Sequence, residues 1–222
     1  MQLSFPFQKK ENSFDEESFL LLGENAAAFK FFKIFFSQKD FVSSRFPSSI
    51  LKGSRGCGKT HLLNIFAQKS QAEFLKKDEI SGVNFGNFFA QNQFYILEDF
   101  DEIKDEELVL HLINSASEAK AFLALSTKEN PQFRLKDLDS RLKNIFCVEI
   151  KEPSEDSLKQ LLVNGLAARQ IKLSRAAIDF IVGRIERSYV AVIAALKLIE
   201  TAVSQDGNGF GMAKIKKIFG DF

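Results

Sequence analysis

The stretch Gly53-Ser54-Arg55-Gly56-Cys57-Gly58-Lys59-Thr60 decides the fold of this chain. It matches the pattern G-x-x-x-x-G-K-[ST], a loop that binds nucleotide phosphates at the start of a helix. Residues 48–52 before it predict a strand, and residues 60–67 after it predict a helix with apolar residues available to face a sheet. The alternative is a glycine-rich turn with an incidental lysine, and the strand–loop–helix order argues against it.

The residue types in this loop suit a polyphosphate. Three glycines allow the backbone to turn its N–H groups inward, and the helix N-terminus adds a partial positive charge. Lys59 is expected to reach the β- and γ-phosphates, and the Thr60 hydroxyl is expected to ligate Mg²⁺. The predicted nucleotide-binding residues are therefore Gly53, Ser54, Arg55, Gly56, Cys57, Gly58, Lys59 and Thr60, with His61 beside them.

Composition excludes several classes of protein. The 222 residues carry a net charge of +1, which is unlike a large basic surface for duplex DNA. The two cysteines lie far apart in the sequence, which favours a reducing, cytoplasmic setting over a disulfide framework or a metal site. We expect no signal peptide and no membrane span, because no apolar run has the required length.

The segment before this phosphate-binding loop, the P-loop, predicts a helix over 26–36, with Asn25 as its N-cap. Leu22 and Asn25 are candidates for the wall of an adenine pocket. The same segment is equally explained as one that only packs on the domain.

Beyond the P-loop, the apolar run 94–99 predicts a buried strand that ends in Glu98 and Asp99. Acids at this position can hold Mg²⁺ or orient a water, so Glu98 and Asp99 are candidate catalytic residues, and Glu98 with Thr60 is the candidate metal site. Residues 105–117 predict an amphipathic helix, and 121–125 predict another buried strand that ends at Ser126 and Thr127.

Arg141 precedes a further predicted strand, 145–150. It is either a surface arginine or an arginine finger that acts on a neighbouring molecule's nucleotide. Helices that alternate with buried strands predict an α/β fold, with a parallel sheet between helices and the site at the strand C-termini.

From Pro153 onward only helices are predicted, so we expect a small all-helical lid. Ser154 and Ser174 are predicted N-caps, and a last helix is predicted over 212–219. The expected core stripe of the third lid helix consists of Tyr189, Ile193, Leu196, Ile199 and Val203. The predicted domains are a flexible tail over 1–12, the nucleotide-binding core over 13–152, and the lid over 153–222.

This layout resembles that of AAA+ proteins. Ser13-Phe14-Asp15 and Leu22-Gly23-Glu24-Asn25 resemble the opening of the AAA+ domain of the replication initiator DnaA, and Ser140-Arg141-Leu142 resembles its arginine-finger motif. The match covers roughly residues 13–205. The chain ends after the lid, without the initiator's DNA-binding domain.

The truncated layout is similar to the Hda family of DnaA-related regulators. Members carry an N-terminal peptide of the form Gln-Leu-Ser-Leu-Pro-Leu that binds the DNA polymerase sliding clamp, the beta subunit. Gln2-Leu3-Ser4-Phe5-Pro6-Phe7 fits this form, with Phe replacing two Leu. From composition alone, a clamp peptide and a frayed terminus are equally good explanations of this tail, and the resemblance favours the clamp peptide.

The resemblance implies a regulator bound to ATP or ADP and Mg²⁺, associated with the nucleoid or replisome. It sits on the clamp, reaches DNA only through it, and uses Arg141 to promote hydrolysis of DnaA-bound ATP, which prevents re-initiation. A homodimer or a higher oligomer is compatible with the sequence. The class that competes most directly is an AAA+ helicase loader or motor, whereas the near-neutral charge argues against a DNA-binding initiator fragment.

Three departures from the initiator predict slow or absent intrinsic hydrolysis. The acidic pair is Glu98-Asp99 where the initiator has Asp-Asp, and Val190 stands where it has a sensor arginine, with Arg187 three residues out of register. For the polar residue that senses the γ-phosphate after the predicted strand 121–125, the candidates are Ser126, Thr127 and Lys128.

Overall fold

The computed structural model describes residues 19–37, 48–80, 85, 88–90, 93–128, 131–206 and 211–220. The described chain divides into two units, one within residues 14–151 and one within residues 152–222. Each unit has its own hydrophobic core, and each is described by itself.

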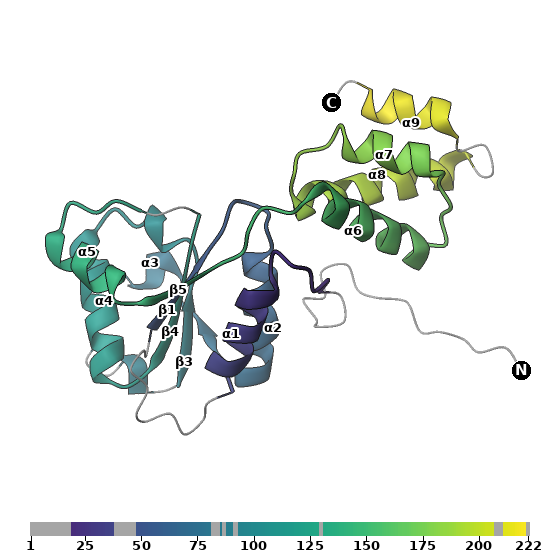
Figure 1. Cartoon of the computed structure of the whole chain (residues 1–222). Helices are drawn as coiled ribbons and strands as arrows, with labels where there is room; N and C mark the ends of the chain where they lie inside the picture. The colour runs from purple at the N-terminus through teal and green to yellow at the C-terminus, as the bar shows by residue number, and fades with distance from the viewer. Residues whose placement is uncertain are drawn as a thin grey trace, which may run out of the picture. The chain divides into compact units, whose positions relative to one another are not determined.

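The first unit alternates helices and strands (Figure 1). Its strands are β1 (Ser48–Lys52), β2 (Glu73–Phe74), β3 (Phe94–Leu97), β4 (Phe122–Thr127) and β5 (Phe146–Glu149). Its helices are α1 (Ala26–Phe35), α2 (Lys59–Ser70), α3 (Lys77–Ile80), α4 (Glu106–Glu118) and α5 (Lys136–Lys143), with short 3-10 helices at η1 (Phe88–Ala90) and η2 (Phe100–Glu102). Every strand pair is parallel, and the order across the sheet is β2-β3-β4-β1-β5. The predicted α/β class is confirmed.

The sheet has a separate core on each face, because successive residues of a strand point to opposite sides. Ile50 and Leu125 point toward the face covered by α4 and α5. Leu51 and Ile96 point toward the face covered by α1 and α2. Figure 1 shows these two helix layers on opposite sides of the sheet.

Phenylalanine builds much of the α1 and α2 face. Phe32, Phe35 and Phe36 recur at helical spacing on α1, and all three are buried. Their rings contact Phe66 of α2 and Phe94 of β3 at centroid distances between 5.4 and 6.5 Å. Such aromatic pairs contribute about 0.5–1.5 kcal/mol each beyond the area that they bury.

Several predicted boundaries change. Strand β4 continues through Ser126 and Thr127, both of which are buried, whereas the sequence placed them after the strand. Helix α2 extends to Ser70, three residues past the predicted end at Ala67. Strand β2 was not predicted, because two residues are too short for a periodic pattern.

The second unit is a helical bundle. Its helices are α6 (Glu155–Ala168), α7 (Arg175–Val182), α8 (Tyr189–Asp206) and α9 (Met212–Phe219). Ser154 and Ser174 cap α6 and α7 as predicted, each accepting a hydrogen bond from the backbone N–H three residues later. All regular elements within 152–206 and 211–220 are helices.

The predicted core stripe of α8 is wrong in one place. Ile193 is 48% exposed, and the buried stripe runs instead through Val192, Ala195, Leu196, Ile199 and Ala202. Leu196 packs so tightly on α6 that a Cβ at Gly165 would lie 2.3 Å from its Cδ1 atom. Leu196 and Ile199 belong to both stripes, and the observed stripe differs from the predicted one in the residues around them. No helix in the described part of the chain is long and apolar enough to cross a membrane.

Candidate nucleotide-binding site

The P-loop lies at the C-terminal end of β1, where parallel sheets hold ligands. Gly56 and Gly58 have φ values of 77° and 103°, which side chains with a Cβ rarely adopt. Gly58 occupies the N-cap position of α2, so the loop runs directly into the positive end of a helix. This conformation forms an anion-binding cradle of the kind expected from the sequence.

Gly53 is required for a different reason, which is close packing. A Cβ at this position would lie 2.5 Å from Cys57 Sγ and 2.7 Å from the carbonyl oxygen of Ile150. The Gly53 N–H donates to the Thr127 carbonyl at 3.2 Å, which ties the start of the loop to β4. Burial raises the pKa of the Cys57 thiol, so it stays neutral and places no negative charge in the cradle.

Lys59 is buried, and its ammonium group donates to two carbonyl oxygens of its own loop. Its Nζ lies 2.7 Å from Gly53 O and 3.1 Å from Ser54 O. These bonds hold the positive charge inside the cradle. The residue is thus placed where the sequence predicted a phosphate contact.

Thr60 and Glu98 meet across the site. The Thr60 hydroxyl donates to Glu98 Oε1 at 2.6 Å, although the residues come from α2 and from the end of β3. A hydroxyl and a carboxylate are hard oxygen ligands of the type that Mg²⁺ takes from a protein, with water and phosphate completing its shell. The two predicted metal ligands therefore fit this ion.

Asp99 adopts an unusual backbone conformation beside Glu98. Its φ and ψ are 48° and 50°, in the left-handed region, and its N–H donates to the Ser126 hydroxyl at 3.0 Å. Ser126 is buried in β4, so the hydrogen bond joins two neighbouring strand ends. Among the polar candidates at the end of β4, Ser126 thus bonds directly to the backbone of the acidic pair.

Lys128 belongs to an ion-pair cluster instead. Its ammonium group bonds to Glu102, which also accepts from Lys77 at 2.6 Å. Both hydrogen bonds lower the pKa of Glu102, to about 2, and the Glu102 carboxylate raises the pKa of Lys128. Glu102 and Lys77 were not predicted, because an exposed pair distant in sequence gives no pattern.

The leading segment lies beside the start of α2. The Phe19 ring meets the His61 ring edge-on at 5.3 Å, and Glu24 O accepts from the Lys151 N–H at 3.2 Å. Phe19 was not among the predicted site residues. The structure thus places Phe19 against the P-loop helix, and the contact of Leu22 with adenine stays a prediction.

Asn25 precedes α1 as expected, but its predicted side-chain cap is wrong. The carboxamide oxygen accepts from Leu22 N at 2.9 Å, and the nitrogen donates to Leu20 O at 2.9 Å. The side chain is 2% exposed and turned back into the preceding turn. Asn25 therefore shapes this segment, and its contact with a nucleotide stays a prediction.

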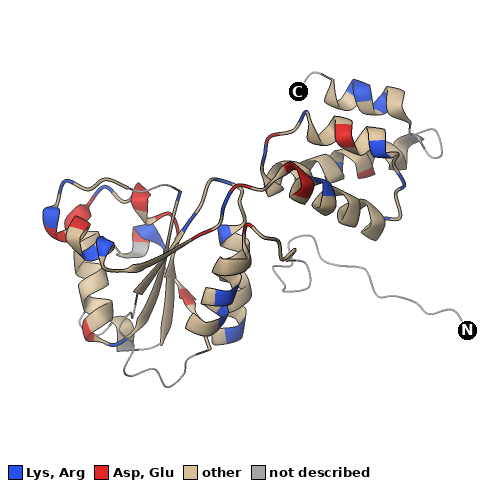
Figure 2. Cartoon of the chain, viewed as in Figure 1, with Lys and Arg blue, Asp and Glu red and all other residues tan. Residues whose placement is uncertain are grey.

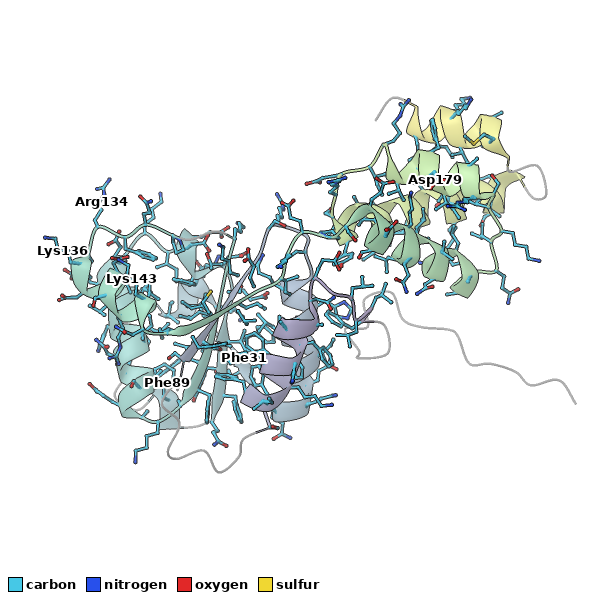
Figure 3. All side chains as sticks on the ribbon, in the orientation of Figure 1. Phe31, Phe89, Arg134, Lys136, Lys143 and Asp179 are labelled. Carbon is cyan, nitrogen blue, oxygen red and sulfur yellow. The ribbon has the colours of Figure 1, made fainter. Side chains whose placement is uncertain are left out.

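Arg141 lies in the last turn of α5. It is exposed, and its guanidinium makes no hydrogen bond or ion pair within the described residues. The nearby Arg134, Lys136 and Lys143 also project from this region, as Figure 3 shows. Along the ribbon in Figure 2, positively and negatively charged residues are otherwise interspersed. The peptide Gln2–Phe7 lies outside the described residues.

No protein-family model matches the chain, and no curated protein sequence does. Solved structures do match. Domain III of the replication initiation protein DnaA from Thermotoga maritima has a TM-score of 0.75 and 14% identity, covering 94% of this chain and 96% of that one. AMPPCP-bound DnaA from Aquifex aeolicus has a TM-score of 0.66 and 16% identity, covering 87% of this chain and 66% of that one.

RuvB from Thermotoga maritima is also similar, with a TM-score of 0.63 and 14% identity over 87% of this chain and 68% of that one. These matches establish the fold, which is that of the AAA+ domains of DnaA and RuvB. The predicted fold class, a P-loop AAA+ core with a helical unit, is therefore confirmed.

Proposed function

We propose that this chain is a DnaA-related AAA+ protein that binds an adenine nucleotide and regulates ATP hydrolysis by DnaA at the sliding clamp. The observation that carries nucleotide binding is the 2.6 Å contact between Thr60 and Glu98 at the mouth of the P-loop cradle. The likeness to DnaA structures with bound AMPPCP supports the adenine class.

Different residues of the chain would bind the phosphates and the metal ion. The backbone N–H groups of the loop and the N-terminus of α2 hold the phosphates, and Lys59 exchanges its carbonyl partners for phosphate oxygens. Thr60 and Glu98 would hold Mg²⁺, which neutralises phosphate charge when bound. Either ATP or ADP satisfies these contacts.

Intrinsic hydrolysis is expected to be slow or absent. The acidic pair is Glu98-Asp99 where the initiator has Asp-Asp, which alters the metal geometry, and Asp99 has a strained left-handed backbone. In the second unit, Val190 is exposed at the position where a sensor arginine would lie. Bound nucleotide would then act mainly as a structural ligand that stabilises the fold.

Two features support action on a second protein. Arg141 presents an exposed guanidinium without an internal partner in the described chain, as an arginine acting in trans requires. Gln2–Phe7 carries the apolar and glutamine pattern of a clamp-binding peptide. Together they support a regulator that docks on the clamp and completes the ATP site of DnaA.

The first experiment measures binding of the full chain to purified sliding clamp. The variant Gln2→Ala/Leu3→Ala should lose binding, and Gln8→Ala, just outside the peptide, should retain it. Binding that survives the double substitution would remove the clamp from the proposal. Nucleotide affinity is measured on the same samples and should be equal in all three.

The second experiment measures hydrolysis of DnaA-bound ATP with clamp loaded on DNA. Arg141→Ala should reduce the stimulation by at least about 100-fold, since trans arginines contribute about 10³–10⁵ in rate. Arg134→Ala is the matched control, because Arg134 is also exposed but precedes α5. Equal stimulation by both variants would exclude Arg141 as the acting group.

The alternative is an AAA+ helicase loader or motor, and the likeness to RuvB favours it. That function requires the isolated chain to assemble with ATP into a ring or filament and to hydrolyse ATP steadily. Analytical ultracentrifugation with ATP and a turnover assay separate the two proposals.

A further inference from the structure

Helix α5, which carries Arg141, is only lightly anchored to the sheet. It has 8 residues, and helices this short are marginal in water without tertiary contacts. Of its side chains, Leu138 alone is buried. A hollow of about 650 Å³ also lies under this helix, lined by Asp139, Leu142 and Lys143 of α5 and by Ile50, Lys52 and Cys147 of the sheet. The position of α5 therefore depends on what holds its two ends.

The start of α5 is held by a carboxylate from another helix. Glu106, in the first turn of α4, accepts hydrogen bonds from the Arg134 N–H at 3.1 Å and from the Leu135 N–H at 2.6 Å. Leu135 is the N-cap residue of α5, and its side chain makes no capping bond. In a capping box, the side chain that bonds the N-cap N–H comes from the third helical residue, which here is the apolar Leu138. Glu106 thus supplies from α4 a contact that α5 cannot make by itself.

The charge of Glu106 also suits this place. The start of a helix carries a partial positive charge, so a carboxylate is stabilising there. Hydrogen bonds to an ionised group are roughly twice as strong as those between neutral groups. Helix α4, which presents this carboxylate, contacts α5 (Figure 1) and is itself anchored by the buried side chains of Val109, Leu112, Ile113 and Ala116. The two bonds therefore fix the start of α5 to a firmly packed helix.

The other end of α5 is fixed by the chain that follows it. The Asn144 and Ile145 N–H groups donate to Arg141 O and Leu142 O, each at 3.1 Å, and β5 begins at Phe146. A helix held at both ends has one direction. A helix held only at its C-terminal end can tilt over the hollow beneath it, and the tilt would displace the guanidinium at the tip of a long side chain.

We propose that Glu106 is a positioning residue for Arg141. It fixes the start of α5, and with it the direction in which the guanidinium meets the nucleotide of a neighbouring molecule. A displacement of about 1 Å can lower a rate about 100-fold, so an arginine that acts in trans depends on such a hold. The inference rests on the proposed function of Arg141, and one part of its test needs neither DnaA nor the clamp.

The first measurement is made on the full-length chain alone. A nitroxide label is attached at position 141 through Arg141→Cys, in a Cys147→Ala background, because Cys147 is exposed whereas Cys57 is 1% exposed. Glu106→Ala should shorten the rotational correlation time of the label in its EPR spectrum. Glu107→Ala is the matched control, since Glu107 follows in the same turn of α4 and makes no hydrogen bond or ion pair among the described residues.

The second measurement is the stimulation of hydrolysis of DnaA-bound ATP. Glu106→Ala should lower it at least about tenfold, and Glu107→Ala should leave it at the level of wild type. Glu106→Gln keeps one acceptor oxygen and should give an intermediate rate. In the Arg141→Ala background, Glu106→Ala should cause no further loss, because both substitutions remove the same interaction. A merely structural role would lower the residual stimulation there as well.

Thermal unfolding and ADP affinity check that each variant is folded, and Glu106→Gln takes the place of Glu106→Ala if the latter is not. Unchanged label mobility in Glu106→Ala, undiminished stimulation by that variant, or additive losses in the double variant would each overturn the proposal. If wild type itself does not stimulate hydrolysis, the proposed function fails, and the label mobility alone then decides whether Glu106 positions residue 141.

Discussion

Replacing Gly53 with alanine tests the packing that fixes the P-loop. The new Cβ would lie 2.5 Å from Cys57 Sγ and 2.7 Å from Ile150 O, both far inside normal contact. The carbonyl belongs to backbone held to β1 by the Ile150 N–H bond, so it cannot move aside freely. Overpacking of this kind costs about 1–3 kcal/mol. For a protein of this size, that lowers the melting temperature by about 2–12 °C.

The displacement of the loop by Gly53→Ala should also weaken nucleotide binding, because the loop N–H groups would no longer point toward the same phosphate position. We expect affinity for a fluorescent ADP analogue to fall at least about tenfold, which is roughly 1.4 kcal/mol. Gly23→Ala is the matched control, since a Cβ there meets nothing within 4 Å. It should keep both the melting temperature and the affinity of wild type.

The Cys57→Ala background separates the two close contacts. Removing Sγ relieves one of them and leaves the Ile150 carbonyl, so Gly53→Ala should cost less stability there than in wild type. Differential scanning calorimetry and fluorescence titration provide the two readouts. If Gly53→Ala and Gly23→Ala behave alike in both assays, the packing argument is wrong.

Three further predictions concern the surrounding site. Thr60→Ala should abolish the increase in nucleotide affinity caused by Mg²⁺. Thr60→Ser keeps the hydroxyl facing Glu98 and should retain that increase. Isothermal titration of both variants with and without Mg²⁺ measures the effect. Hydrogen bonds hold the pKa of Glu102 at about 2 in the folded protein, below its value in the unfolded chain. The pairing of Glu102 with Lys128 therefore makes its full contribution to stability at neutral pH. That contribution should disappear as pH falls from about 4.5 toward 2, so melting curves of wild type and Glu102→Gln should converge in acid and differ at pH 7. Asn25→Ala should destabilise the core by about 1–3 kcal/mol by leaving two groups of the preceding turn unpaired, measured by urea unfolding; an unchanged midpoint would contradict the hydrogen-bond assignment.

The sequence predicted the elements whose signals are local. The P-loop, the strand before it and the helix after it follow from one motif, and β1 has the predicted bounds. Ser154 and Ser174 were predicted as caps from residue type and spacing, because a cap is a contact over three residues.

Tertiary contacts decided the rest. Asn25 has a good capping residue type, but two backbone groups of the turn before it compete for its carboxamide. In α8, Leu196 was predicted to be buried, but its close approach to Gly165 of α6 is a contact between helices that apolar spacing does not reveal. Within the site, the bond between Ser126 and Asp99 joins residues far apart in the chain, so the sequence supplied only a choice of candidates.

The bonds that Lys59 makes to Gly53 O and Ser54 O bear on how quickly ligand exchanges. Because these carbonyl oxygens replace phosphate oxygens as acceptors, the buried ammonium group keeps hydrogen-bond partners when the ligand leaves. Arrival of a nucleotide then swaps one set of acceptors for another and demands little rearrangement of the chain. Such preorganisation spends little of the binding energy on ordering the loop, so association should approach the rate of diffusional encounter, and residence time should be governed by dissociation.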